Sequence, residues 1–434
     1  MRPTSFKTVV NTFAHHLMTI RKCSLILLAM AGFFATGITL SCTQTQETPK
    51  PKYVFYFIGD GMGLAHVSLA EAYLAAQDNK IASYSLNFST FPVIGLATTF
   101  SDSNVITDSS AAGTALSTGE KTTNGMLGVR TDGGPLKSIS YSIHDAGYKV
   151  GVTSSVTIDH ATPAAFYASS SARSSYYDIA LQLTQTDFEF FGGGGFLQPA
   201  GKENDKTNIY EAVKAAGYTV ARGLNSYASA KQGASKMFYT QAEGLESDLP
   251  YAIDRKDGDL SLAKVVEAAI DFLDNPTGFF LMSEGGKIDW AAHSNDAKAT
   301  ILETIDFAEA IAVALEFYKK HPNETLIVVT ADHETGGLAL AETGGYHMYF
   351  DKFALQTQSI DLIKATQPSP QAAVEAIRKM NKDAKIGWTS SSHSGIAVPV
   401  YAIGAGSARF GGKMDNTDIP KRICELMGVT FTQQ

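Results

Sequence analysis

Cysteine is scarce in this sequence, with three residues in a chain of 434. Two of them, Cys23 and Cys42, fall in an N-terminal segment with the features of an export signal, so Cys424 stands alone in the rest of the chain. A lone thiol cannot form an internal disulfide, and stability must therefore come from the hydrophobic core and from bound metals. Cys424 itself is expected to be a small buried residue of a C-terminal helix.

Positive charge is also in short supply. The formal net charge is −8, which offers no general attraction to nucleic acid or acidic lipid, and no nucleic acid is expected as a specific partner. An anionic substrate would have to be attracted locally, by metal ions or by a few placed cations. Hydrophobic residues make up 44% of the chain and charged residues 18%, which is typical of a globular protein and not of a disordered one.

The apolar run near the N-terminus, residues 25–40, is short for a membrane-spanning helix. Two basic residues precede this run, and small residues and Cys42 end it. The pattern predicts an export signal over residues 1–42, followed by a polar linker over residues 43–52. A retained membrane anchor is the alternative, but the length and the flanks favour export.

The end of this segment leaves its processing open. Leu40-Ser41-Cys42 resembles a bacterial lipobox, in which the cysteine is lipidated and begins the mature chain, whereas Thr39 departs from the leucine usual at its position. A lipid on Cys42 would anchor the protein in the outer membrane and would be its only contact with a membrane. Simple cleavage would leave a periplasmic protein, and Met18 is an alternative start of the chain.

After the linker, short apolar runs alternate with segments of helical spacing. The runs predict buried strands at residues 53–58, 149–153, 188–191, 279–282, 326–330 and 398–403. Helical spacing is found at residues 64–76, 139–146, 262–273 and 298–318. Continuous apolar strands joined by helices indicate an α/β fold, with a large, mainly parallel central sheet covered by helices on both faces.

The remainder, residues 53–434, is therefore predicted to be one catalytic domain. Two stretches, residues 197–260 and 338–388, are more polar and less periodic, and we expect them to be surface insertions that leave the sheet. In parallel sheets, functional residues gather beyond the carboxyl ends of the strands, and the motifs can be compared with that expectation.

Three acidic motifs follow or end predicted strands. Asp60, in IGDGMG, comes directly after the strand at 53–58, and flanking glycines would let its carboxylate approach a metal without obstruction. Glu284 precedes two glycines at another strand end. Asp332 and His333 follow the strand at 326–330, and this oxygen and nitrogen pair suits zinc.

Further candidate ligands lie outside these strand ends. Asp289 and His293 are four residues apart, so on a helix they share one face and can chelate one ion. His393 precedes the last predicted strand, and Thr162 offers a hydroxyl. Each alone has a simpler interpretation, such as a surface pair or a surface loop histidine. Together they are too many ligands for one ion and suit a cluster of two or three.

Two residues point to an anionic substrate. Ser109 opens a segment of small residues that predicts a tightly packed helix, and exposed N–H groups at a helix N-terminus favour an anion. A serine at that place could attack phosphorus, although a plain capping serine is the alternative. Arg173 could hold a phosphate with two hydrogen bonds, although a solvated arginine is the default.

The same residues, in the same order, resemble the alkaline phosphatase family from about residue 53 to the C-terminus. The motifs that carry the resemblance are IGDGMG, TDSSAAGTALSTG, HATPAA with Arg173, EGGKIDWAAH, TADHETGG and HSG. The resemblance implies hydrolysis of phosphate monoesters to an alcohol and inorganic phosphate through a phosphoserine at Ser109. It also implies a site with two Zn²⁺ ions and one Mg²⁺ ion, in which Co²⁺ could replace zinc, and the possibility of a homodimer.

The resemblance further assigns the ligands. Asp60 would bridge one zinc and the magnesium-type site, which Thr162 and Glu284 complete. The zinc that activates Ser109 would be held by Asp332 and His333, and the other zinc by Asp289, His293 and His393. Arg173 would bind two oxygens of the phosphate.

His160 and Trp290 are assigned to substrate binding and depart from one familiar pattern. The best-known enterobacterial relatives have aspartate and lysine there, whereas histidine and tryptophan look like the variant of some marine and thermophilic members. The change removes a carboxylate near the magnesium-type site and a cation near the phosphate, so altered metal affinity is expected at that site.

Other reactions and roles remain to be separated from this one. The sequence has no Cys/Ser-x-Pro-x-Arg signature, so a sulfatase is disfavoured. Phosphodiesterases of the same superfamily usually lack the complete third site that Thr162 and Glu284 would supply. A surface lipoprotein with purely structural metals would need neither Ser109 nor Arg173.

Overall fold

Ten strands among the described residues form one sheet. The structure is a computed structural model that describes residues 50–81, 83–342 and 345–433. The strands of the sheet are β1 (Tyr53–Gly59), β2 (Val93–Thr98), β3 (Lys149–Ser154), β4 (Phe190–Gly193), β5 (Tyr218–Arg222), β6 (Lys236–Thr240), β7 (Phe279–Gly285), β8 (Thr325–Thr330), β13 (Val398–Gly404) and β14 (Gly412–Asp415). They lie side by side in the order β14-β2-β13-β8-β1-β7-β3-β4-β6-β5.

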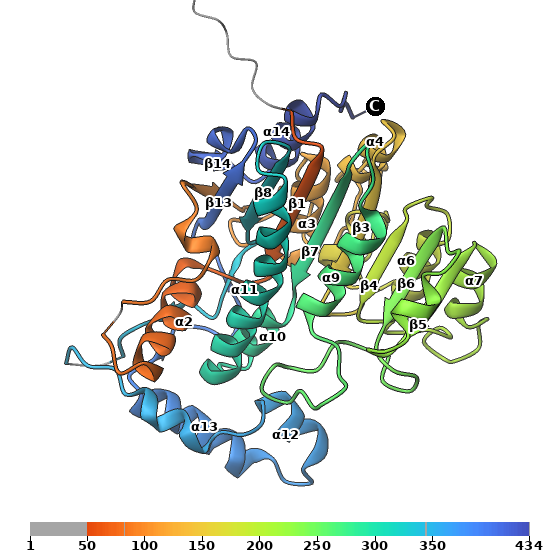
Figure 1. Cartoon of the computed structure of the whole chain (residues 1–434). Helices are drawn as coiled ribbons and strands as arrows, with labels where there is room; N and C mark the ends of the chain where they lie inside the picture. Colours follow the sequence, from red (N-terminus) through yellow and green to blue (C-terminus); the bar gives the residue numbers. More distant parts are fainter. Residues whose placement is uncertain (1–49, 82, 343–344, 434) are drawn as a thin grey trace, which may run out of the picture. The chain divides into compact units, whose positions relative to one another are not determined.

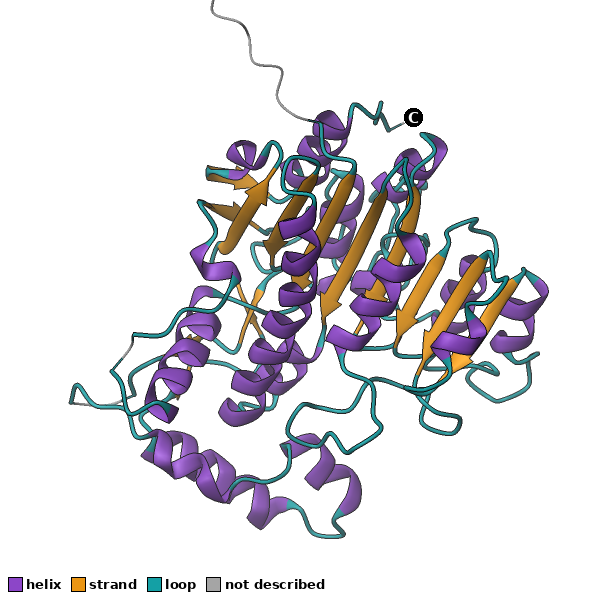
Figure 2. Ribbon diagram, viewed as in Figure 1, coloured by secondary structure: helices purple, strands orange, loops and turns teal. Residues whose placement is uncertain are grey.

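Helices cover both faces of this sheet (Figures 1 and 2). Helices α9 (Leu262–Leu273) and α11 (Ala297–Lys320) cross one face, and α3 (Ser109–Thr118) lies behind the sheet in Figure 1. The other α-helices of the described chain are α2 (Leu64–Gln77), α4 (Ile139–Asp145), α5 (Ala161–Ala164), α6 (Tyr176–Leu183), α7 (Ile209–Ala215), α8 (Tyr227–Ala230), α10 (Lys287–His293), α12 (Ile360–Thr366), α13 (Gln371–Asp383) and α14 (Asp418–Met427). The predicted α/β fold is confirmed, and every predicted strand and helix is present with ends within three residues of the expected ones.

The central strands are buried along their whole length because both of their faces are covered. All seven residues of β1 are buried, as are all seven of β7 and all six of β8. Such strands show no alternation of polar and apolar residues, which is the pattern of a parallel sheet packed between helices. Burying a side chain such as Phe55 or Phe57 stabilises the fold by about 1.5–3 kcal/mol.

Strand β13 runs against its neighbours and so begins where they end. Its pairs with β2 and β8 are antiparallel, whereas the remaining pairs of the sheet are parallel. Val398, the first residue of β13, lies opposite Ala97, near the end of β2. The segment before β13 therefore reaches the same edge of the sheet as the segments that follow β1, β3 and β8.

Part of the stretch 197–260, which was expected to leave the sheet, belongs to it. It contributes β5 and β6, which extend the sheet beyond β4. Strand β5 lies at the sheet's edge and keeps three of its five residues partly exposed. An edge strand has more polar residues than a central one, and that composition hid β5 from the sequence pattern.

Residues 338–388 lie outside the central sheet. They contain α12, α13, the 3-10 turn Phe350–Leu355 and the short paired strands β10 (Leu338–Ala339) and β11 (Gly387–Trp388). Their two helices pack on each other through a small apolar cluster of Ile360, Ile363, Val374 and Ile377. Figure 1 shows α12 and α13 on the side where β1 and β7 end.

The predicted export signal, including Cys42, and most of the linker lie outside the described residues. Among the helices that are described, none combines the length and the apolar character needed to cross a membrane.

Cys424 should be chemically inert in the folded protein. It lies on α14 with 1% of its surface exposed, and burial raises the pKa of its thiol to about 12. At pH 8 the group stays protonated, and the thiolate is the reactive form. We expect Ellman's reagent to find equal numbers of thiols in the native wild-type and Cys424→Ser proteins, with a difference only after denaturation. A difference between the native proteins would contradict this prediction.

Candidate metal centre

Acidic residues converge at the carboxyl edge of the sheet because the strands that deliver them are neighbours. Strand β1 lies between β7 and β8, and Ile58 pairs with Glu284 on one side and Thr330 on the other. Asp60 follows β1 and Asp332 follows β8, so the three carboxylates meet at one edge. Asp60, Glu284 and Asp332 are each 0% exposed.

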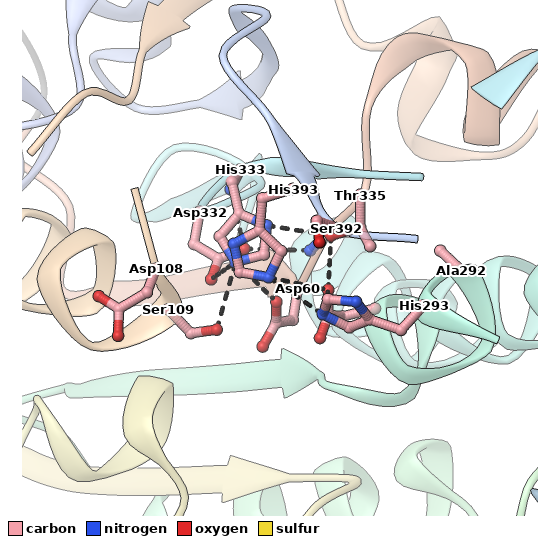
Figure 3. Close-up of polar contacts among 12 residues, drawn as sticks. Asp60, Asp108, Ser109, Ala292, His293, Asp332, His333, Thr335, Ser392 and His393 are labelled. Atoms are coloured by element: carbon pink, nitrogen blue, oxygen red, sulfur yellow. Dashed lines mark hydrogen bonds and ion pairs between the residues drawn. The ribbon is translucent and has the colours of Figure 1, made fainter. Parts of the chain in front are cut away.

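The first group of possible metal ligands consists of Asp60, Asp332 and His333. The Nε2 atom of His333 lies 3.4 Å from Asp60 Oδ1 and 3.1 Å from Asp332 Oδ2. The Oγ atom of Ser109 is 3.2 Å from the same Nε2 atom. Figure 3 shows Ser109 reaching toward His333 and Asp60. Ser109 thus lies in contact with the ligand group to which the family resemblance assigned it.

The second group consists of Asp289, His293 and His393. Asp289 and His293 lie on α10 as predicted, and their Oδ1 and Nε2 atoms are 3.3 Å apart. His393 comes from the short strand β12 (His393–Ser394), and its Nε2 atom is 3.1 Å from His293 Nε2 and 3.6 Å from Asp289 Oδ1. Strand β12, which precedes β13, therefore adds a third possible ligand to the two that α10 provides.

Backbone carbonyls orient both histidines of the second group. His293 Nδ1 donates to Ser391 O at 2.7 Å, and His393 Nδ1 donates to Thr107 O at 2.8 Å. Because each Nδ1 carries the proton of such a bond, each Nε2 is left to face the group. Histidines that bind metals are commonly oriented in this way.

The third group consists of Asp60, His160 and Glu284, so Asp60 belongs to two groups. The hydroxyl of Thr162 lies near Glu284 but has no partner at hydrogen-bond distance. Burial and the charge of Arg173 lower the pKa of His160 to about 4, so its imidazole is neutral at pH 7. The sequence assigned His160 to the substrate, whereas the geometry also places it among possible metal ligands.

The spacing of these atoms fits metal ions. A tetrahedral zinc site with bonds of about 2.0–2.1 Å separates its ligand atoms by about 3.3 Å. The distances in the first and second groups run from 3.1 to 3.6 Å. Several buried oxygens also have no hydrogen bond: both of Asp60, one each of Glu284 and Asp332, and the hydroxyl of Thr162. Such atoms in a native fold call for another partner.

The charges of the groups lead to the same conclusion. Burial, together with neighbouring carboxylates, raises the pKa of Asp60 well above its usual value, and burial raises that of Glu284 to about 8. Burial also opposes ionisation of Asp289, but the adjacent histidines hold its pKa below the usual value. Cations would remove the repulsion and allow all of these carboxylates to ionise.

Glycine is required at position 61 to bring Asp60 to this edge. Gly61 has φ +74°, a conformation that residues with a side chain rarely adopt, and a Cβ atom there would lie 2.9 Å from Asp289 Cα and from Thr335 Oγ1. Its N–H donates to Asp332 Oδ1 at 3.1 Å. The glycine expected from the motif therefore lets Asp60 of the first group come close to Asp289 of the second group.

Ser109 begins a helix whose end is held by Asp108. All ten residues of α3 are buried, and the Asp108 side chain caps the helix by accepting from Ala111 N. Asp108 also accepts from Ser110 Oγ at 2.7 Å and from Arg173 Nη1 at 3.1 Å. Burial opposes its ionisation, but these hydrogen bonds and the arginine charge lower the pKa of Asp108.

Arg173, His160 and Trp290 lie together beside α3. Arg173 Nη2 is 3.4 Å from His160 Nε2, and the rings of His160 and Trp290 meet edge to face at 5.6 Å. Every residue assigned to the site from the sequence is thus found at this edge of the sheet.

Three contacts were missed by the sequence analysis. Asp108 holds Arg173, Ser154 donates to Glu284, and Thr335 donates to Asp289. Asp108 and Thr335 both lie inside motifs that were singled out, so their positions beside Ser109 and His333 were the available signal. Ser154 ends β3, and strand-end position was its only signal.

A mainly parallel sheet that gathers carboxylates, imidazoles and a helix-end serine at its carboxyl edge defines a class of α/β proteins with groups of possible metal ligands at that edge. The model of the alkaline phosphatase family matches residues 51–429, and the chain belongs to this family. Alkaline phosphatase 4 of Bacillus subtilis (strain 168) is 33% identical over 454 residues, which cover 92% of this chain and 94% of the relative.

Solved structures of this family share the fold. The cold-active alkaline phosphatase from the psychrophile Shewanella sp. matches with a TM-score of 0.77 at 28% identity, covering 86% of this chain and 99% of that chain. The alkaline phosphatase from the Antarctic bacterium TAB5 matches with a TM-score of 0.70 at 32% identity, covering 87% and 99%. A histidine-to-aspartate variant of the TAB5 enzyme has Mg bound in its M3 site.

Removing divalent ions should destabilise the protein, because the buried carboxylates lose their counter-charge. An ion present at about 1,000 times its Kd stabilises the folded state by about 4 kcal/mol. We expect dialysis against EDTA to lower the Tm in calorimetry by several degrees, and Zn²⁺ with Mg²⁺ to restore it. Metal analysis of the same samples would verify removal. An unchanged Tm in metal-free protein would contradict the prediction.

Proposed function

We propose that this protein hydrolyses phosphate monoesters to an alcohol and inorganic phosphate through a phosphoserine at Ser109. The observation that carries the proposal is the position of Ser109 Oγ. It lies at the N-terminus of the buried helix α3 and 3.2 Å from His333 Nε2, within the first group of ligands. Family membership supports the same reaction.

The three groups would hold two Zn²⁺ ions and one ion of the magnesium type. The first group suits the zinc next to Ser109, the second group suits the other zinc, and the third group with Thr162 suits the remaining ion. Bound ions of this kind lower the pKa of an oxygen nucleophile and neutralise phosphate charge. Co²⁺ could occupy the zinc positions.

Ser109 would act as the nucleophile and Arg173 as the phosphate ligand. Ser109 Oγ forms a bond to phosphorus as the bond from phosphorus to the alcohol oxygen breaks, and water then cleaves the phosphoserine. The N-terminus of α3 favours the anion throughout. Ser110 is the weaker candidate for attack, because its hydroxyl donates to Asp108.

Arg173 is oriented to donate two hydrogen bonds to one phosphate. Asp108 holds its Nη1 atom at 3.1 Å, which fixes the plane of the guanidinium, and a quarter of the side chain remains exposed (26%). A guanidinium held in this way can bind two oxygens of one phosphate. A monoester offers more such oxygens than a diester, which favours the monoesterase.

We also propose an exported protein that forms a homodimer. The predicted signal over residues 1–42 supports export, to the periplasm or to the outer membrane through a lipid on Cys42. Association of two copies is supported by apolar side chains that are exposed on and after β2: Ile94, Leu96, Phe100, Val105 and Ile106.

The reaction class can be tested with three nitrophenyl esters. We expect cleavage of p-nitrophenyl phosphate at alkaline pH, lost on chelation and restored by Zn²⁺ and Mg²⁺. Cleavage of the bis-ester and of the sulfate ester should be much slower. The bis-ester carries one negative charge fewer than the monoester, and the sulfate ester has no phosphorus for the serine to attack and also carries less charge. Preference for the bis-ester would indicate a phosphodiesterase. If the metal-loaded protein cleaved none of the three esters, the proposal that it is a hydrolase would be refuted.

The identity of the nucleophile can be tested with two adjacent serines. Ser109→Ala should lower kcat by about 10³-fold or more while the bound metals are retained, since it removes the attacking oxygen. Ser110→Ala is the matched control and should lose less than about tenfold. A Ser109→Ala protein with unchanged turnover would favour a binding role for the metals.

The role of Arg173 can be tested through the product. Loss of a charge-assisted hydrogen bond costs about 1.5–3 kcal/mol, which corresponds to about 10–100-fold in affinity. We expect Arg173→Ala to raise both the KM and the inhibition constant of inorganic phosphate by this factor, with unchanged metal content. Arg173→Lys should recover only part of the loss, because it cannot form the paired bonds. An unchanged inhibition constant would exclude Arg173 from the phosphate.

A further inference from the structure

The hydroxyl of Thr335 lies between one ligand of the first group and one of the second. Thr335 Oγ1 is 2.5 Å from Asp289 Oδ1 and 3.2 Å from His333 Nδ1. The residue is 0% exposed. Figure 3 shows Thr335 beside the histidines, on the side of the cluster away from Ser109. Sequence and family assigned no role to this residue.

The direction of both hydrogen bonds follows from which groups carry a proton that they can donate. An ionised carboxylate can only accept, so the one proton of the Thr335 hydroxyl goes to Asp289. The bond to His333 must then be accepted by the threonine oxygen, which requires a proton on Nδ1. A neutral His333 therefore keeps its lone pair on Nε2, the atom that faces Ser109, Asp60 and Asp332.

This arrangement differs from that of the two histidines of the second group. His293 and His393 donate their Nδ1 protons to the backbone carbonyls of Ser391 and Thr107, which any residue at those positions would supply. For His333, the described part of the chain offers Nδ1 only the Thr335 side chain. The tautomer of His333 thus depends on which side chain stands at position 335.

The backbone of Thr335 is held in place independently of its hydroxyl. It forms the short strand β9 (Glu334–Thr335), in which Thr335 pairs with His393 of β12. Its N–H donates to Gly61 O at 3.1 Å. A residue without the hydroxyl can therefore keep the same backbone position, and the effect of the hydroxyl can be measured separately.

We propose that Thr335 is a positioning residue that couples the two metal groups by fixing the tautomer of His333 and the orientation of Asp289 through one hydroxyl. A change at either ligand is passed to the other through this oxygen, so the affinities of the two groups for metal are linked. The inference rests on the metal groups of the proposed function but not on the reaction they would support.

The test compares metal binding by variants at position 335. Thr335→Val keeps the shape and removes the hydroxyl, whereas Thr335→Ser keeps the hydroxyl. Thr304→Val is the matched control, because Thr304 is equally buried on α11 and its hydroxyl donates to the Thr300 carbonyl (2.8 Å). Titration of the metal-free proteins with Zn²⁺ in a calorimeter gives affinities, and the visible spectrum with Co²⁺ reports the geometry of each group.

Loss of an outer partner of a metal ligand typically weakens metal affinity by 10–100-fold. We expect about this loss for Thr335→Val in both groups, together with an altered Co²⁺ spectrum. Thr335→Ser should stay within about threefold of the wild type and keep its spectrum, and Thr304→Val should bind as the wild type does. If Thr335→Val does not fold, Thr335→Ala takes its place, since it also lacks the hydroxyl and adds no bulk.

Linkage is tested by adding His293→Ala, which damages only the second group directly. In the wild-type background this change should also weaken Zn²⁺ binding to the first group, and in the Thr335→Val background that second effect should disappear. The proposal would be overturned if Thr335→Val and Thr335→Ser bound Zn²⁺ with equal affinity. This holds whether both variants bind as the wild type does or both bind equally more weakly. Because the readout is metal binding, the proposal can fail while phosphatase activity persists, and it can hold if no ester is cleaved.

Discussion

Four carboxylates are buried together at one edge of the sheet, and their mutual repulsion is the constraint on which the rest of the site depends. Asp60, Glu284, Asp289 and Asp332 are each at most 4% exposed. Burial and like charge raise the pKa of Asp60 and Glu284, whereas histidines lower that of Asp289. The two opposite directions show that the neighbouring histidines favour the ionised form of Asp289, whereas Asp60 and Glu284 lack such compensation. Metal ions would supply the remainder, which makes metal binding part of the stability of the fold.

The sheet meets this constraint by fixing its ligands on strand ends. Carboxylates at the ends of β1, β7 and β8 cannot move apart, because these strands are hydrogen-bonded neighbours in register. The antiparallel β13 begins at this edge, so His393 of β12, which precedes it in the chain, reaches the site from the opposite chain direction. Rigid placement of this kind lowers the cost of ordering ligands around an ion and holds the serine at the end of α3 at a fixed distance from them.

The sequence predicted most of this arrangement because the ligands are encoded next to the strands that place them. Asp60 and Asp332 each follow an apolar run directly, and Asp289 and His293 share a helix face by spacing alone. Strand β5 was hidden by the mixed composition of an edge strand. The roles of Asp108 and Thr335 could not be predicted, because a contact such as that between Thr335 and Asp289 joins residues 46 positions apart and depends on a few tenths of an ångström.

The composition of the third group has a consequence for the ion it would bind. Magnesium prefers a shell of oxygens with octahedral geometry, whereas imidazole nitrogen suits zinc or cobalt. His160 places a neutral ring beside Asp60 and Glu284, where a carboxylate would have contributed both an oxygen and a charge. The group therefore has less negative charge and a softer ligand than an all-oxygen site, so its preference for Mg²⁺ over Zn²⁺ should be weaker. The same neutral ring also leaves the nearby Arg173 without a second carboxylate, so that more of its charge is free for a phosphate.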